Sequence, residues 1–158
     1  MNRDELIICA ELLKDTLISY MKYPQNNYLK DQFRYAYRNT FFLIGRKYEA
    51  SQAAYHDFYD KTGLDIRDYK WGQTVNHIRL NTHYAFEHKT PANVFKEELI
   101  HLANEGKLTT DAIVEMIDNQ EYWWITKEEN ERLNAKGFKS KRPDSDEANR
   151  LCGIIKKD

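Results

Sequence analysis

The chain has 158 residues, a length that suits one domain with its own hydrophobic core. Hydrophobic residues make up 41% of the chain and charged residues 31%, a composition typical of globular proteins that excludes a disordered or membrane-spanning class. The formal net charge of −1 excludes a polycation that would coat nucleic acid indiscriminately, so any basic surface must be local.

Helical patterns dominate the first part of the chain. Apolar residues recur at helical spacing over about residues 2–21, and Pro24 ends this first predicted helix. A second pattern predicts a long helix over about 28–60, which Gly45 bends or breaks and which Gly63 ends from the C-terminal cap position. We expect the two helices to form an antiparallel hairpin within residues 1–63.

A smaller α+β part is expected to follow over residues 73–154, within a single domain 1–158. Residues 73–86 are ambiguous and fit either a helix or a pair of short strands. The later elements expected in chain order are a helix over 91–105, a helix over 111–118 that Thr109 or Thr110 starts, a strand near 121–126 and a helix over 127–136. A capping box, Thr126-Lys127-Glu128-Glu129, is predicted to open the last of these helices. The predicted fold class is therefore mainly α, with an N-terminal helical hairpin and a smaller C-terminal α+β unit.

The histidines are concentrated in one part of the sequence, since all five lie within residues 56–101. If 73–86 is helical, His83 and Glu87 share a helix face, and Glu97 and His101 do so on the next helix. Two such pairs facing each other would supply four ligands to a divalent metal, the one cofactor the sequence suggests. The competing interpretation is that they are solvated ion pairs, with no cofactor bound.

His88 lies just before a predicted helix start, where backbone N–H groups and the helix dipole favour an anion such as phosphate. Phosphodiester cleavage needs a group that moves a proton and cations that neutralise charge on phosphorus. The sequence therefore predicts His88 as general acid/base, with Lys89, Arg79 and His83 as stabilising groups. The alternative is structural, with His88 buried against Pro91 and Lys89 paired in solvent.

A basic stripe is predicted on the second helix. Lys30, Arg34 and Arg38 follow one another at four-residue intervals and share a helix face, interleaved with tyrosines. Cations beside aromatic rings suit nucleic acid. A second basic segment, with Lys141 and Arg142, is a candidate for further phosphate contacts. The alternative for the stripe is a solvated face or an internal ion-pair network.

Several short motifs in the second half resemble those of one group of proteins. They are Glu87-His88-Lys89-Thr90-Pro91, the run Trp124-Ile125-Thr126-Lys127-Glu128-Glu129-Asn130, Lys141-Arg142-Pro143 and Leu151-Cys152-Gly153-Ile154. Small prophage and mobile-element proteins carry a similar E-H-x-x-P element, I-T-K-E-E helix start, basic-proline segment and terminal G-I. The resemblance covers roughly residues 83–154 and implies phage-related, nucleic-acid-associated biology without a catalytic assignment.

These observations give two leading hypotheses for function, beside a third in which the chain is a metal-dependent hydrolase that uses His83, Glu87, Glu97 and His101. The first is a small nucleic-acid-processing protein, most concretely a nuclease that uses His88. The second is a non-catalytic regulatory or inhibitor protein that binds a protein partner through a Tyr/Arg-rich helical surface including Tyr35 and Arg38. Only two cysteines, Cys9 and Cys152, are present, too few for a disulfide framework, so a reducing, cytoplasmic location is expected.

Overall fold

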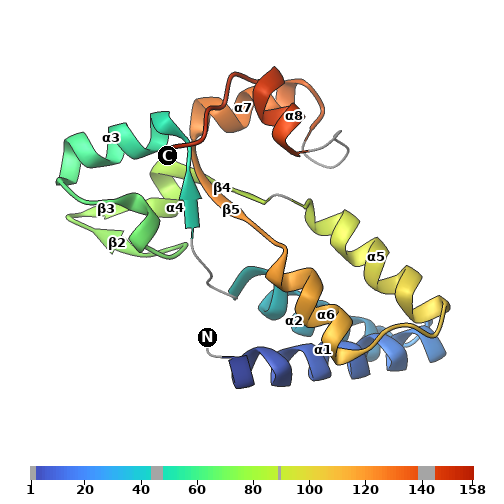
Figure 1. Cartoon of the computed structure of the whole chain (residues 1–158). Helices are drawn as coiled ribbons and strands as arrows, with labels where there is room; N and C mark the ends of the chain where they lie inside the picture. The colour runs from blue at the N-terminus through green and yellow to red at the C-terminus, as the bar shows by residue number, and fades with distance from the viewer. Residues whose placement is uncertain (1–2, 44–47, 89, 139–144) are drawn as a thin grey trace. The chain divides into compact units, whose positions relative to one another are not determined.

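The computed structural model describes residues 3–43, 48–88, 90–138 and 145–158 (Figure 1). The chain forms two compact units, each built from two separate stretches of sequence. The first unit contains Met1–Gly45 and Ala92–Gln120, and the second contains Arg46–Pro91 and Glu121–Asp158. These boundaries differ from the expected sub-units 1–63 and 73–154, while the single-domain organisation of the chain stays a prediction.

The first unit is helical, and it begins with the expected hairpin. Its elements are α1 (Arg3–Lys22), α2 (Asn27–Leu43), α5 (Ala92–Asn104) and α6 (Thr110–Asp118). Pro24 lies in the turn between α1 and α2, and the side-chain oxygen of Asn26 accepts hydrogen bonds from the backbone N–H groups of Tyr28 and Leu29. This capping satisfies N–H groups that the first turn of α2 leaves without helical partners.

One face of each helix enters a common core in the first unit. The buried residues at helical spacing are Leu6, Ala10, Leu13 and Leu17 of α1, Phe33, Ala36 and Tyr37 of α2, Phe95 and Leu99 of α5, and Ile113, Val114 and Ile117 of α6. The threonine that precedes α6, Thr109, accepts a 3.1 Å hydrogen bond from the N–H of Ala112 and so caps that helix as expected.

The second predicted helix, over 28–60, is wrong as a single element. After α2 ends, the chain forms strand β1 (Tyr48–Ala50), and a separate helix, α3 (Gln52–Thr62), begins beyond it. Ser51 explains the new start, because its side chain accepts a hydrogen bond from the N–H of Ala54. Gly63 ends α3 in the left-handed conformation with φ of 70°, as its position predicted.

The ambiguous segment 73–86 contains both strands and a helical turn. Short strands β2 (Thr74–Val75) and β3 (Ile78–Arg79) form a hairpin whose turn residues have positive φ. One helical turn, α4 (Leu80–His83), then leads into strand β4 (Tyr84–His88).

The main sheet of the second unit has the strand order β1-β5-β4. Strand β5 (Tyr122–Thr126) is the strand expected near 121–126, and it pairs in parallel with β1 and antiparallel with β4. As the central strand it is covered on both faces, which explains why the run from Tyr122 to Ile125 is apolar and buried without alternation. The predicted fold class is confirmed: mainly helical, with an N-terminal hairpin and a small mixed sheet.

Helices cover both faces of this sheet (Figure 1). On one face, Tyr84, Tyr122 and Trp124 pack against Phe58 of α3 and Ile66 of the short 3-10 helix η1 (Ile66–Asp68). On the other face, side chains of β4 and β5 pack against α7 (Lys127–Ala135), α8 (Ser145–Leu151) and the residues after α8. The second unit is therefore a three-layer arrangement around one short sheet.

A buried carboxylate ties the start of α7 to the start of α3. Glu129 completes the predicted capping box, since its carboxylate accepts a 2.8 Å hydrogen bond from the N–H of Thr126, whose hydroxyl caps the helix in return. The same carboxylate accepts a 2.6 Å hydrogen bond from the hydroxyl of Ser51. Among the described residues, no helix is long and apolar enough to cross a membrane.

Candidate nucleic-acid interface

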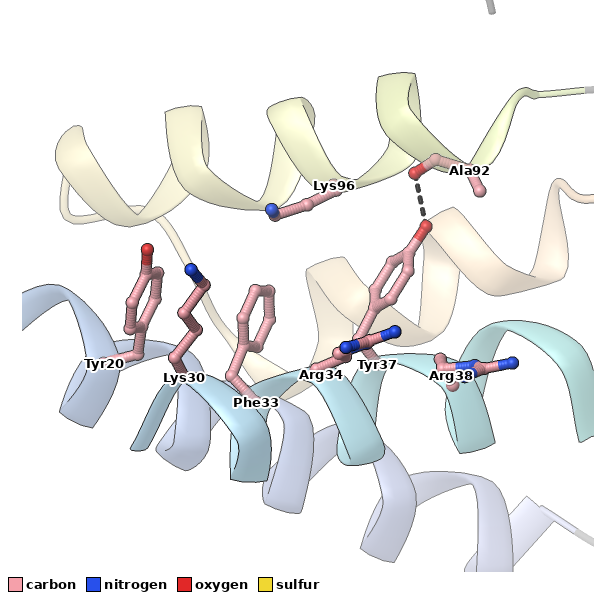
Figure 2. A pocket seen from close by; sticks show the side chains of 8 residues that line it. All are labelled: Tyr20, Lys30, Phe33, Arg34, Tyr37, Arg38, Ala92 and Lys96. Carbon is pink, nitrogen blue, oxygen red and sulfur yellow. Dashed lines mark hydrogen bonds between the residues drawn. The ribbon is translucent and has the colours of Figure 1, made fainter. Parts of the chain in front are cut away.

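The structure brings the three cations of the predicted stripe together in the first unit. Lys30, Arg34 and Arg38 all line a groove between α2 and α5, as Figure 2 shows. Their four-residue spacing places the Cβ atoms of neighbouring cations about 6 Å apart, one helical turn from each other. Their role in binding stays a prediction, but the shared position that such a role requires is present.

We call this hollow the α2–α5 groove. It is lined by Tyr20, Lys30, Phe33, Arg34, Tyr37, Arg38, Ala92 and Lys96, and has a volume of about 430 Å³. Its floor is aromatic: Phe33 and Tyr37 are buried, and the half-buried ring of Tyr20 stacks on Phe33 with centroids 5.7 Å apart and planes at 8°. The groove therefore combines an apolar floor with a cationic rim.

A fourth cation, Lys96, comes from α5 and was not among the predicted site residues. Its amine lies 6.0 Å from the centroid of the Phe33 ring, opposite the cations of α2. Sequence spacing relates residues on one helix only, so the signal for Lys96 exists only once α5 is known to pack beside α2.

A hydrogen bond crosses the groove between its two helices. The hydroxyl of Tyr37 donates it to the backbone carbonyl of Ala92, which ties α2 to the first residue of α5. Figure 2 shows Tyr20 on one side of this bond and Arg38, which also lines the groove, on the other. The bond therefore divides the groove, and the part beside Tyr20 contains Lys30, Phe33 and Lys96.

The charge in the groove is uncompensated. Its lining has four cations and no acidic residue, and none of these cations forms an ion pair within the part of the chain that the structure describes. Elsewhere cations do pair, as Lys61 does with Asp57 at 2.7 Å and Lys107 with Glu105 at 2.7 Å. Within the described residues, the stripe is therefore not an internal ion-pair network, one of its two alternative explanations; the other, a solvated face, stays an alternative.

An exposed aromatic ring lies on the outer side of the same helix. A second, smaller hollow is lined by Asp31, Arg34, Tyr35 and Arg38. Arg34 and Arg38 thus border both hollows, while Tyr35 keeps 65% of its surface exposed. Because Asp31 is the one acid in this second lining, the local balance there remains positive.

The predicted catalytic residues that the structure describes, His88, Arg79 and His83, belong to the second unit but do not gather at one point. His83 ends α4, is exposed, and holds its Nδ1 atom 3.1 Å from the carbonyl oxygen of Arg79. His88 lies at the far end of β4, about 16 Å along the chain at the ordinary rise of a strand. His83 and Arg79 are neighbours, whereas His88 is separated from both.

His88 has an aromatic environment. It is half-buried, and its ring meets those of Phe86 and Tyr122 edge-on, with centroids 5.6 and 5.2 Å away. The strand register explains this, because His88 pairs with Tyr122 and shares a strand face with Phe86. The structure thus shows this histidine packed against aromatic rings of the sheet.

The premise of the metal hypothesis is wrong for its first pair. His83 ends a helical turn and Glu87 lies on strand β4, so the two do not share a helix face. Glu97 and His101 both lie on α5, in the first unit, one helical turn apart. The Nε2 atom of His101 is 3.3 Å from the Oε1 atom of Glu105. Across the described residues, no group of three or more His, Cys, Asp or Glu side chains is placed to hold a metal ion.

One polar network near the predicted site was not anticipated. Asp57 of α3 accepts 2.7 Å hydrogen bonds from the hydroxyl of Tyr84 and the amine of Lys61. Burial acts to raise the pKa of Asp57, but these hydrogen bonds and the nearby positive charges outweigh it, so the pKa lies below its ordinary value. Burial and the Asp57 carboxylate raise the pKa of Tyr84 above its usual range.

Three predicted site residues, Lys89, Lys141 and Arg142, lie outside the described residues. Comparison of the chain with family models found no match, and searches of curated proteins and of solved structures found none either. The candidate site therefore rests on the chemistry and geometry of its own residues.

Proposed function

We propose that this protein binds single-stranded nucleic acid through the α2–α5 groove and the adjoining face of α2. The observation that carries the proposal is a groove lined by four cations, with an aromatic floor and no acidic side chain. Phosphate oxygens are the anionic groups that nucleic acid presents at regular intervals, and cation contacts to them supply most of its sequence-independent affinity.

The spacing of the cations fits a strand that runs along α2. Lys30 and Arg38 are eight residues apart, which corresponds to about 12 Å along a helix axis. A single strand presents its negatively charged phosphates at regular intervals along the backbone, so a row of this length meets more than one of them. The row therefore suits several successive phosphates rather than one isolated anion.

The exposed ring of Tyr35 favours unpaired bases. Because Arg34 and Arg38 lie between this ring and the groove, phosphates held by the two arginines bring a neighbouring base close to Tyr35. A base can stack on such a ring only when its own face is free, as in a single strand. Tyr28, at the start of α2, is exposed as well and extends the aromatic edge.

Cleavage of the bound strand by His88 stays a hypothesis. A single histidine can move a proton, but two of the three groups predicted to assist it, Arg79 and His83, lie toward the other end of β4. The third, Lys89, lies outside the described residues. Binding does not depend on cleavage, so the two are tested separately in the same experiment.

The test is a fluorescence anisotropy titration with labelled single-stranded and duplex DNA and RNA, with and without divalent metal. We expect the wild type to bind single strands more tightly than duplexes. We expect Arg34→Ala/Arg38→Ala to weaken binding by a factor of ten or more, since contacts to charged groups are worth about 1.5–3 kcal/mol each.

The matched control is Lys70→Ala/Lys136→Ala, which removes two exposed cations from the second unit and changes the net charge equally. This control should bind like the wild type. If both double variants lose affinity alike, the effect is one of net charge and the proposed groove is wrong. If no nucleic acid binds but an acidic protein does, the partner-binding hypothesis takes its place.

A further inference from the structure

We propose that the α2–α5 groove receives the phosphorylated end of a nucleic-acid strand, an inference that rests on the proposed function. The hydrogen bond between Tyr37 and Ala92 crosses the groove, and Lys30 and Lys96 lie on the same side of it as Tyr20. A continuous strand that followed the whole groove would have to pass this bond. An interior segment therefore follows the outer face of α2, beside Arg34 and Arg38, and the part of the groove beside Tyr20 suits a terminus.

The charge inside the groove matches a terminal phosphate better than an internal one. A terminal phosphomonoester carries a charge of about −1.5 to −2 at pH 7, whereas a phosphodiester carries a single negative charge. The amines of Lys30 and Lys96 come from opposite helices and point into the same part of the groove (Figure 2). Two compact ammonium groups with no acid between them are suited to a doubly charged anion.

The remaining surface fits the nucleotide attached to that phosphate. The volume of about 430 Å³ falls in the range of small-ligand pockets, and the aromatic floor of Phe33 and Tyr20 is apolar. Because the ring of Tyr20 is only half-buried, part of its surface can contact the terminal base. Phosphate and base would thus meet cations and aromatic rings in the same hollow.

The experiment compares one single-stranded 12-mer with an internal label in three forms: 5′-phosphate, 3′-phosphate and hydroxyl at both ends. We expect one phosphorylated form to bind about tenfold more tightly than the hydroxyl form at pH 7.5. Lys30→Ala/Lys96→Ala should reduce that ratio to about one, while Lys70→Ala/Lys136→Ala should keep it. Circular dichroism and a thermal melt establish that each variant is folded.

A pH series gives a second readout that needs no variant. The second pKa of a phosphomonoester is near 6, so the terminal phosphate loses charge when the pH falls from 7.5 to 5.5. The preference of the wild type for the phosphorylated end should then fall to about threefold. A preference that does not change over this pH range would contradict recognition of the doubly charged end.

Failure of this inference is distinct from failure of the proposed function. Equal affinity for all three forms, with binding still salt-sensitive, would overturn the end-recognition inference and leave strand binding intact. A preference that survives in Lys30→Ala/Lys96→Ala would place the phosphate elsewhere and also overturn it. Displacement of the strand by an equimolar nucleoside monophosphate would show that the groove takes a free nucleotide instead. No binding in any form would refute the proposed function itself.

Discussion

The salt dependence of the binding constant measures how many phosphates the cations of the α2–α5 groove neutralise. Each phosphate contact to a single strand releases counterions and contributes about −0.7 to the slope of log K against log salt concentration. Four contacts, one for each of Lys30, Arg34, Arg38 and Lys96, give a slope of about −2.8. Affinity should therefore fall about 50-fold between 50 and 200 mM salt.

The perturbation is Arg34→Ala/Arg38→Ala, which leaves two of the four cations in the groove. The expected slope becomes about −1.4, so the same change in salt lowers the affinity only about sevenfold. The lost affinity and the reduced slope have one cause, the loss of two phosphate contacts.

Anisotropy titrations of a labelled 12-mer at four or five salt concentrations measure both slopes. The control Lys70→Ala/Lys136→Ala should keep the slope of the wild type, because its cations lie outside the groove. If the slope were the same in the arginine variant and the wild type, Arg34 and Arg38 would not contact phosphates, even if the variant bound more weakly. The lower affinity of the variant would then have another cause than lost phosphate contacts.

Three further predictions concern the second unit. Glu129→Ala should lower the free energy of unfolding, measured in urea, by about 2–3 kcal/mol, because the buried Glu129 carboxylate accepts two hydrogen bonds. The control is Glu131→Ala, an exposed residue of the same helix, which should change this free energy by less than about 0.5 kcal/mol. Equal effects of the two substitutions would contradict the prediction. The stability of the fold should decline as the pH falls below 3.8, the ordinary pKa of Asp57. Because the pKa of Asp57 is lower in the folded chain, the unfolded chain binds the proton first as the pH falls. The stabilisation is complete above the ordinary pKa and is lost as the pH falls through the folded-state pKa. Asp57→Asn should flatten this decline in a series of thermal melts, and an unaltered pH profile would show that Asp57 does not contribute to it. His88→Phe should keep the ring contacts and strand binding and should abolish any cleavage, with circular dichroism used to establish that the variant is folded. A variant that still cleaves would exclude His88 as the acid/base group.

The features that the sequence predicted correctly are those determined by neighbouring residues. The capping box of Thr126 and Glu129 involves atoms three residues apart, and Gly63 ends its helix through its own backbone conformation. The cation stripe is likewise local, because helical spacing alone places Lys30 and Arg38 on one face. Such features depend little on tertiary contacts with distant segments of the chain.

The features that the sequence missed depend on distant segments. Residues 48–50 form a strand because they pair with β5, which lies more than 70 residues later in the chain. The residues next to 48–50 in the sequence do not indicate which distant segment they pair with. The same limit applies to Lys96, which faces the stripe only because α5 packs beside α2. His83 and His88 are close in the sequence, yet the extended strand between them keeps them apart, so their proximity in the sequence suggested a convergence that β4 prevents.

Ultraviolet crosslinking of a bound thymidine-containing 12-mer, followed by mass spectrometry of the crosslinked peptides, tests most directly whether nucleic acid binds at the α2–α5 groove. We expect crosslinks within α2, above all at the exposed ring of Tyr35, and a second set at Tyr20 when the strand carries a terminal phosphate. Crosslinks confined to the second unit, around β4 and His88, would contradict this expectation and would place the nucleic acid on the sheet instead.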